Sequence, residues 1–559
     1  MKRRDVIKGL SILPLAGAVA GNSLQSAFAE TGTEGLLPNP LNTEPVLPGP
    51  LKPGPRIYQS IGVEPIINGR GTLTMIGASV ELPEVRTAME HAALYNVQLD
   101  ELAMAVGKRL SEITGAEWGM VSSGCAAGLK HVAVGCLTDG NPEKLVRIPN
   151  LEGFQKTEVI IPKPMRNFYD HAIRNTGMKV IMPETLEELE NAISPRTALI
   201  YMFGYREPFT TQAVAKIARA KGIPTLLDVA AERLTIPNVH LNNGIDVVAY
   251  SGGKVIRGPQ CAGLLLGKKD LLMAAWQSGS PHHGPGRDNK VGREEHIGML
   301  AAVEAWAVRD HAAEARLWKS WMDAIAKKVT AIDGVTAQVT EPAPETLNNA
   351  SPRVTISWDP NKFHITGAEL TDELANTPPR IGLSGGGRGP AGAAPNPNLT
   401  SISVSGSMLQ PDQIKVIGDR ITEVLTRKRE AKTVIPMKAP STDLAGRWDV
   451  TVQFYTGTSQ HNFYIEKQDG NYIQGTHKGD FSSRELVGSI DGDQIKFNSR
   501  WSVPGDTIDY TFYGTVSGDT MTGDIHMGEY LTSKFTAKRY TYPNARVNVV
   551  VPKGPPLGN

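Results

Sequence analysis

The sequence is poor in cysteine. Only three cysteines occur among 559 residues, namely Cys125, Cys136 and Cys261. The disulfide framework of a small secreted domain needs a larger, paired set, so the sequence excludes that class of protein. Cys125 and Cys136 are expected to flank one helix, too far apart to bridge, and we expect all three thiols to be free.

An excess of charge is also missing. Lysine and arginine number 58 against 57 acidic residues, which leaves a net charge of +1, and no basic stripe carries interleaved aromatic residues. Proteins that bind nucleic acids concentrate positive charge, so we expect no nucleic-acid partner. No segment offers the ~20 apolar residues that span a bilayer, so we also expect no stable membrane insertion.

A modest apolar stretch lies near the start of the chain, after several charged residues. Residues 1–30 contain, in order, Arg3-Arg4, Ile7, Lys8, apolar residues interrupted by glycine and serine, and Ala27-Phe28-Ala29 as a small-x-small cleavage site. This pattern is typical of a twin-arginine export signal. It predicts a periplasmic protein that has the twin-arginine translocation machinery as a partner.

Composition divides the rest of the chain. Residues 31–56 are Pro-rich and are expected to form a tether, 57–330 alternate helical and strand-like segments, and 331–430 form a smaller α+β region. After a linker at 431–442, residues 443–545 alternate apolar and polar residues with evenly spaced turns, and 546–559 form a tail. Such alternation without helices is typical of a small closed antiparallel barrel.

The region 57–330 determines the fold class. Its alternating helices and strands indicate an α/β domain with a mostly parallel sheet and a site at the carboxyl ends of the strands. We expect one long helix over 293–329. The run Gly385-Gly386-Gly387 with Arg388 is expected in a loop, as an anion clamp or as a flexible linker.

The segment Ser251-Gly252-Gly253-Lys254 follows an apolar strand at 246–250. Its glycines are expected to let a bulky ligand approach the backbone. A lysine there suits Schiff-base chemistry with pyridoxal 5'-phosphate (PLP), and Ser251 is expected to form a hydrogen bond with the phosphate. The alternative is a solvated lysine in a Gly-rich loop.

A second candidate, Asp228, ends the apolar run at 224–228. An aspartate at a buried strand end is suited to pair with the ring nitrogen of PLP, and Ala230 is small enough to lie against a flat ring. Asp228 in the role of a helix cap is the alternative.

The third candidate is Ser122-Ser123-Gly124-Cys125, where a strand turns into an apolar helix. Backbone N–H groups at a helix start suit a phosphate, although any strand-to-helix turn has this form. The order of a phosphate turn, an aspartate and Ser-x-x-Lys at successive strand ends is shared by fold-type I PLP enzymes. The sequence therefore predicts this fold, with a large domain, a small α+β domain and then the barrel.

Longer segments resemble the bacterial selenocysteine synthase (seryl-tRNA selenium transferase) family, and within it the branch of D-glucosaminate-6-phosphate ammonia lyase. The resemblance lies within about 56–428, in the segments 64–129, 166–177, 226–232, 250–272 and 286–304. The opening Gly446-Arg447-Trp448 of the last region resembles that of a lipocalin-like barrel.

The resemblance implies roles for individual residues. Lys254 attaches the cofactor, Asp228 pairs with its ring nitrogen, and Ser123, Gly124, Cys125 and Ser251 surround its phosphate. No metal is implied.

The resemblance also brings a group of cationic residues towards the acidic group of a substrate, namely Arg166, His283, Arg287 and Lys290. A solvated charged loop is the alternative for the last three. Relatives place a ring-stacking histidine just before the Arg-Asn pair, where this chain has Met165, so His171 or Tyr169 has to serve.

These observations predict an exported, PLP-dependent lyase or transferase, a homodimer or higher homo-oligomer, that acts on an amino acid or amino sugar acid. Lys254 is expected to be the base that removes the α-proton. We expect α,β-elimination of the ammonia lyase type, with racemase, aldolase or aminotransferase activity as alternatives. A non-catalytic periplasmic binding protein is the contrasting class.

Overall fold

The computed structural model describes residues 49–387, 396, 398–433 and 435–542. The predicted export signal, most of the Pro-rich segment, Arg388 and the tail at 546–559 lie outside the described residues. The chain divides into two compact units, which we call unit 1 (Met1–Ile148 and Pro224–Lys432) and unit 2 (Pro149–Ile223 and Thr433–Asn559).

A seven-stranded sheet runs in the order β2-β8-β7-β6-β5-β3-β4. Its strands in unit 1 are β2 Trp118–Ser122, β8 Gly263–Gly267, β7 Val247–Ser251 and β6 Thr225–Asp228, and in unit 2 they are β5 Thr197–Phe203, β3 Glu158–Ile160 and β4 Lys179–Ile181. β6 pairs in parallel with β7, and β3 with both β4 and β5, whereas β8 is antiparallel to both β7 and β2. The predicted mostly parallel α/β sheet is confirmed.

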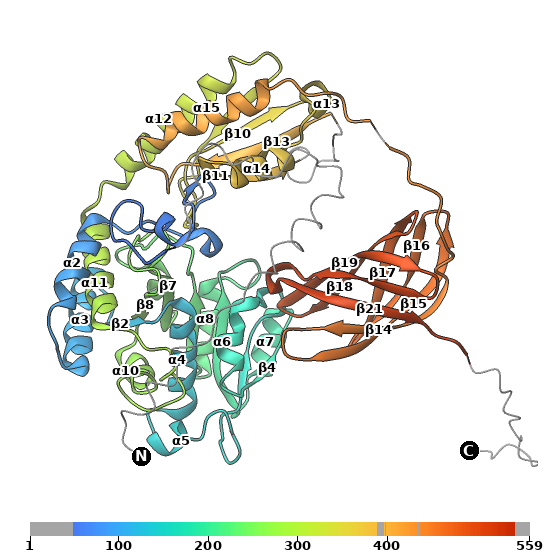
Figure 1. Ribbon diagram of the computed structural model, residues 1–559. Coiled ribbons are helices and arrows are strands. Elements are labelled where there is room, and N and C mark those ends of the chain that lie inside the picture. The colour runs from blue at the N-terminus through green and yellow to red at the C-terminus, as the bar shows by residue number, and fades with distance from the viewer. Residues whose placement is uncertain (1–48, 388–395, 397, 434, 543–559) are drawn as a thin grey trace, which may run out of the picture. The chain divides into compact units, whose positions relative to one another are not determined.

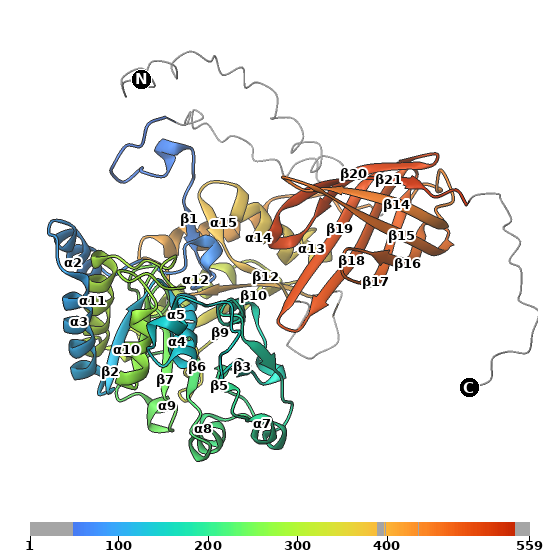
Figure 2. The same ribbon diagram turned by 90° about the horizontal axis from the view of Figure 1, so that it is seen from below.

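Within each unit, helices lie beside the strands (Figures 1 and 2). Those of unit 1 before the small sheet are α2 Pro83–Ala93, α3 Leu99–Thr114, α4 Cys125–Thr138, α5 Pro142–Leu145, α9 Val239–Asn242, α10 Lys269–Gln277 and α11 Arg293–Val308, with 3-10 turns at Gln59–Ile61 and Thr74–Ile76. Unit 2 contributes α6 His171–Arg174, α7 Leu186–Ala192 and α8 Thr211–Ala220, with 3-10 turns at Lys163–Met165, Phe168–Asp170 and Gly528–Tyr530. Every residue of α4 except Ala126 is buried, so this helix lies in the core.

The single helix expected over 293–329 is wrong, because the structure has two. α11 ends at Val308, Arg309 is extended with φ −67° and ψ 139°, and α12 spans His311–Val329. The Asp310 side chain accepts a hydrogen bond from the backbone N–H of Ala313. An aspartate that caps a new helix in this way favours a break over a continuous helix.

The small α+β region of unit 1 is built on a four-stranded sheet in the order β12-β13-β10-β9. Its strands are β9 Thr336–Thr340, β10 Arg353–Trp358, β12 Ser384–Gly387 and β13 Thr400–Ser405; its helices are α12, α13 Pro360–Phe363, α14 Gly367–Asn376 and α15 Gln413–Thr426; and β1 Ile66–Asn68 pairs with β11 Arg380–Gly382. Val354, Ile356 and Trp358 alternate into its core.

The loop expected at the glycine run is also wrong, since Gly385 to Gly387 belong to β12. A Cβ atom on Gly385 would lie 2.7 Å from the side chain of Thr371 in α14. Glycine is therefore needed here for close packing of a helix on a strand.

The C-terminal part of unit 2 is a closed antiparallel barrel of eight strands, as predicted (Figure 2). The strands are β14 Gly446–Gln453, β15 Thr458–Asp469, β16 Tyr472–Lys478, β17 Ser483–Asp491, β18 Gln494–Val503, β19 Asp506–Ser517, β20 Thr520–His526 and β21 Thr532–Arg539. Gly470 and Gly492 have φ of 57° and 63°, which suits glycine in the hairpin turns. Trp448, Phe463, Phe497 and Phe512 fill the interior.

Within the part of the chain that the structure describes, no helix has the length and apolarity needed to cross a membrane.

Candidate active site

Three strands of unit 1 end at the same edge of the sheet. β6 and β7 are parallel, and β2 runs in their direction because both β2 and β7 are antiparallel to β8. Their last residues are Asp228, Ser251 and Ser122. The three predicted site segments therefore begin at the carboxyl ends of neighbouring strands, where α/β proteins bind ligands.

Lys254 lies half-buried in a tight turn after β7. Its carbonyl oxygen accepts a hydrogen bond from the N–H of Arg257 at 2.9 Å. The glycines before it do not leave room for a ligand, contrary to our expectation. A Cβ atom on Gly252 would lie 2.7 Å from Met299 Sδ, and one on Gly253 would lie 3.0 Å from the Cα of Gln260. They let the lysine turn pack against the protein itself.

Asp228 is 3% exposed at the end of β6. Its Oδ1 atom accepts a hydrogen bond from the N–H of Ala230 at 3.0 Å and lies 3.7 Å from the Sγ of Cys125. The carbonyl oxygen of Ala230 in turn accepts from the N–H of Ser251 at 3.4 Å. The segment that carries the aspartate is thus joined directly to the start of the lysine turn.

The turn between β2 and α4 is shaped by glycines. Gly124 has φ 82°, and its carbonyl oxygen accepts a hydrogen bond from Ser122 Oγ at 2.8 Å. A Cβ atom on Gly263 of β8 would lie 2.5 Å from the carbonyl carbon of Gly124. No side chain caps α4, so the N–H groups of its first turn, which have no partner within the helix, are available to an anion. Ser123 lies half-buried in this turn.

The surroundings of Cys125 show that the segments carrying Cys125, Asp228 and Lys254 meet. Burial, and next the negative charge of Asp228, raise the pKa of its thiol well above the usual value, while the charge of Lys254 lowers it. The thiol is therefore neutral and donates to the carboxylate. A lysine, a buried carboxylate and an uncapped helix start lie together, which fits the aldehyde, the ring nitrogen and the phosphate of PLP.

The predicted substrate residues His283, Arg287 and Lys290 lie exposed in the loop between α10 and α11. Among the described residues, none of these three side chains has an ion-pair partner in the structure. Within the described part of the chain, none of the three forms a hydrogen bond or an ion pair with Lys254.

Two residues that the sequence reasoning missed hold this loop on α4. Lys130, with a side chain only 11% exposed, forms an ion pair with Asp288 at 2.8 Å. His131 Nδ1 lies 2.8 Å from Ser278 Oγ, and burial lowers the pKa of His131 to about 4. Gly279 and Gly286 both approach the His131 ring, since a Cβ atom on either would lie within 2.5 Å of its Cε1. A lysine and a histidine inside an apolar helix were the signal available in the sequence.

The remaining candidates belong to unit 2. Arg166 is engaged with the fully buried Asp170, with Nε at 2.5 Å from Oδ2, and Arg174 contacts the same carboxylate at 2.7 Å. His171 is exposed and its Nε2 lies 2.8 Å from Asp506 Oδ2 at the start of β19. Tyr169 lies near Phe203, with ring centroids 6.3 Å apart. In unit 2 Arg166 and His171 thus already have acidic partners.

Known proteins resemble this chain in the same region. Residues 161–290 match the family model of class-V aminotransferases. That segment contains both Asp228 and Lys254.

Several curated relatives are enzymes with different reactions. The chain is 28% identical over 299 residues to D-glucosaminate-6-phosphate ammonia lyase of Salmonella typhimurium (strain 14028s / SGSC 2262), over 51% of this chain and 78% of the relative. It is 27% identical over 342 residues to 5'-C-glycyluridine monooxygenase-decarboxylase of a Streptomyces species, over 58% and 83%. It is 29% identical over 283 residues to L-seryl-tRNA(Sec) selenium transferase of Moorella thermoacetica, over 44% and 55%.

A solved structure of D-glucosaminate-6-phosphate ammonia-lyase matches the fold with a TM-score of 0.58 and 23% identity, over 67% of this chain and 99% of that chain. The chain is homologous to fold-type I, PLP-dependent enzymes. Its relatives include a lyase and a transferase, so the homology extends to the enzyme class and not to one reaction.

Proposed function

We propose that the chain is an exported PLP-dependent ammonia lyase that acts on a β-hydroxylated amino acid or amino sugar acid. The observation that carries the proposal is the meeting of Lys254, Asp228 and Cys125 at the strand ends, in a chain related to an ammonia lyase. A sugar phosphate is a less suitable substrate for an exported enzyme, so we expect the free acid.

PLP, when bound, supplies an aldehyde for the substrate amine and an electron-withdrawing ring. Asp228 would pair with the protonated ring nitrogen, and its burial among apolar strands strengthens that interaction. The N–H groups at the start of α4, with Ser123, Gly124 and Ser251, would bind the phosphate.

Lys254 would attach the cofactor and then, with its amine released, remove the proton from the Cα atom of the substrate. The net reaction converts a β-hydroxy amino acid into a 2-keto acid and ammonia without a second substrate, so its atoms balance. The exposed basic residues His283, Arg287 and Lys290 would attract the acidic group of the substrate. We propose a homodimer or higher homo-oligomer as the assembly.

The reaction is tested with a panel of β-hydroxylated amino acids and amino sugar acids in D₂O. Ammonia and keto acid are measured as products, and deuterium is measured at the Cα atom of the recovered substrate. We expect ammonia and keto acid in equal amounts. Interconversion of enantiomers alone would establish a racemase, cleavage of the Cα–Cβ bond an aldolase, and keto acid only with an added amino acceptor an aminotransferase. If the protein binds a ligand but shows neither turnover nor a visible cofactor band, it is a binding protein.

Export is supported by the arginine pair and the small-x-small site in residues 1–30. The twin-arginine route moves folded proteins, so it suits an enzyme that acquires PLP in the cytoplasm. Replacing Arg3 and Arg4 by lysine should retain the protein in the cytoplasm, because the transporter reads the arginine pair itself. Unchanged periplasmic protein on cell fractionation would contradict the export proposal.

A further inference from the structure

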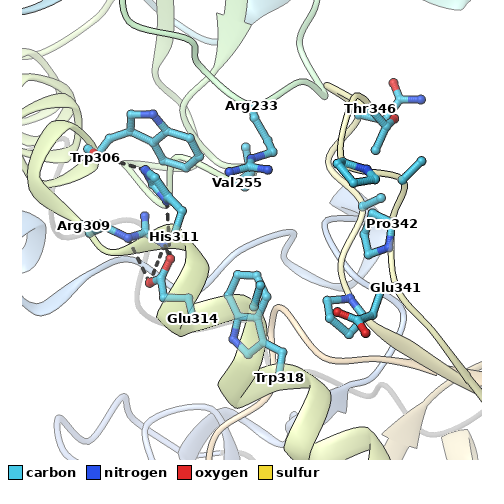
Figure 3. Close-up of a pocket in the computed structure, with 16 residues that line it drawn as sticks. Arg233, Val255, Trp306, Arg309, His311, Glu314, Trp318, Glu341, Pro342 and Thr346 are labelled. Carbon is cyan, nitrogen blue, oxygen red and sulfur yellow. Dashed lines mark hydrogen bonds and ion pairs between the residues drawn. The ribbon is translucent and has the colours of Figure 1, made fainter.

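Unit 1 contains a cavity of about 140 Å³ that the proposed reaction does not use (Figure 3). One side is formed where α11 passes into α12, by Trp306, His311 and Trp318. The other side is the Pro-rich segment between β9 and β10, which includes Pro342 and Thr346. Arg233 and Val255 also line the cavity.

The cavity shares its walls with the site segments. Arg233 follows Asp228 by five residues, and Val255 follows Lys254 directly. The N–H of Arg233 donates to the carbonyl of Leu347 at 2.7 Å, and Glu232 forms a β-bridge with Asn348. The Pro-rich segment is therefore attached by backbone hydrogen bonds to the chain just after Asp228, which gives this wall of the cavity a defined position.

Arg309 lies on one wall of the cavity, and one of its donor atoms has no hydrogen-bond acceptor in the described part of the chain. Its Nε and Nη2 atoms donate to the carboxylate of Glu314 at 2.8 to 3.0 Å. Its Nη1 atom is buried and has no acceptor among the described residues. Glu314 is also approached by His311 Nδ1 at 3.6 Å. The acidic group in this wall is thus already neutralised, and the group left without a partner is a cationic donor.

A second guanidinium adds to the positive charge. The Arg233 side chain lines the cavity half-buried and forms no ion pair within the described residues. Nearby, burial lowers the pKa of Arg257, and the positive charge of Arg309 lowers it further. Glu341 also lines the cavity, but it is exposed to solvent, where its charge is screened.

Much of the remaining lining is apolar and flat, namely the Trp306 and Trp318 indoles and the rings of Pro342, Pro344 and Pro352. Thr346 and Asn348 add polar groups to it. The Trp306 and His311 rings lie against each other with centroids 4.1 Å apart. A cavity of about 150 Å³ with an apolar lining holds a benzene-sized molecule. This cavity is of that size, and unlike such a cavity it contains unpaired donors.

We propose that this cavity binds a small organic acid, whose planar apolar body lies between the indoles and the prolines and whose carboxylate faces Arg309 Nη1 and Arg233. The proposal goes beyond the reaction proposed above. It concerns a second ligand site, and its test does not depend on which substrate reacts at Lys254.

The test uses benzoate as the ligand and the holoenzyme as the protein, with binding followed by isothermal titration calorimetry and by tryptophan fluorescence. Benzamide, which has the same shape without the charge, is the ligand control. Ala315→Leu fills the cavity from α12 with a good helix former, and Arg233→Gln removes one of the two guanidiniums. Arg316→Gln, at an exposed neighbouring position on α12, is the matched control.

We expect saturable binding of benzoate to the unmodified protein and to Arg316→Gln. Binding should be at least about tenfold weaker for Arg233→Gln and for benzamide, since one charge-assisted hydrogen bond has about this effect. Ala315→Leu should abolish binding. If benzoate does not bind, if benzamide binds equally well, or if Ala315→Leu binds benzoate normally, the proposal is wrong, whether or not the protein releases ammonia from any substrate.

Discussion

Buried polar groups occur both at the candidate site of unit 1 and inside the barrel of unit 2, but they are arranged differently. At the site, Lys254, Asp228 and Cys125 come from three separate strand ends. In the barrel, His461 Nδ1 lies 2.9 Å from His477 Nε2, and His477 Nδ1 lies 3.1 Å from Ser499 Oγ. The barrel groups point from strands into a closed interior and bond one another.

The surroundings of the two clusters differ as well. The His477 ring packs edge-on against Phe463 and Phe512, with centroids 5.4 and 5.3 Å away. Asp228 instead lies where the backbone leaves the sheet, beside an uncapped helix start. Polar groups that bond one another among aromatic rings specify packing, whereas polar groups gathered at strand ends can face a ligand. Substitutions of the buried polar groups in the barrel should therefore alter stability. Substitutions of the polar groups at the strand ends should alter turnover.

The largest effect should come from Lys254→Ala. We expect loss of the visible cofactor band and of turnover, because no other amine occupies that turn. Peptide mapping after borohydride reduction should find the cofactor on Lys254 in the unmodified protein and in Lys268→Ala, a surface control on the opposite side of the sheet. A label on any other lysine would overturn the assignment.

Asp228→Ala should lower turnover by about 100-fold or more, because it removes the charge that supports the ring nitrogen, while borohydride still labels Lys254. Asp246→Asn is the matched control. Asp246 precedes β7 at the other edge of the sheet, where its Oδ2 accepts from the N–H of Thr225 at 2.8 Å. Equal turnover in the two variants would show that Asp228 is structural, like the buried histidines.

The histidines should determine how stability depends on pH. Burial lowers the pKa of His477 to about 2 and that of His131 to about 4. Below pH 6.5 the unfolded chain binds protons that the folded chain excludes, so stability is complete above pH 6.5 and falls as the pH is lowered. As the pH falls from 7 to 5, each histidine should lower the free energy of unfolding by about 2 kcal/mol.

Below pH 4, the stability of the region around His131 and that of the barrel should depend differently on pH. The contribution of His131 levels off there, whereas that of His477 continues to fall towards pH 2. Hydrogen exchange in α4 and in β16, measured from pH 7 to 3.5 in the unmodified protein, His131→Gln and His477→Gln, checks this. A barrel whose acid sensitivity is the same in His477→Gln would contradict the role given to the buried pair.

The smallest effect should come from Asp288→Asn, which removes the negative charge that faces the buried amine of Lys130. We expect faster hydrogen exchange over 284–290 and a rise in KM of several-fold, about 1 kcal/mol, with little change in kcat. Asp270→Asn, on the exposed start of α10, is the control. Unchanged exchange in Asp288→Asn would mean that the loop is held by His131 and Ser278 alone.

Much of this architecture could be predicted from the sequence. Alternation with a period of two predicted the barrel, and the order of strand and helix segments predicted the sheet and the strand-end positions of Asp228 and Lys254. The break at Asp310 was missed because residues that favour helix lie on both sides of it, whereas the cap that begins a new helix is a local feature. The glycine strand was missed because Gly385 packs against Thr371, a contact that no local pattern indicates.

The sequence by itself determined which segments end in chemically active residues, because strand periodicity and turn residues are local properties. Only the tertiary structure decided that the Cys125 thiol lies on Asp228, that His171 lies beside Asp506, and that Lys130 holds the loop through Asp288. These contacts join residues far apart in the chain. Which partners meet therefore depends on strand order, helix packing and turn geometry, which one-dimensional patterns do not contain.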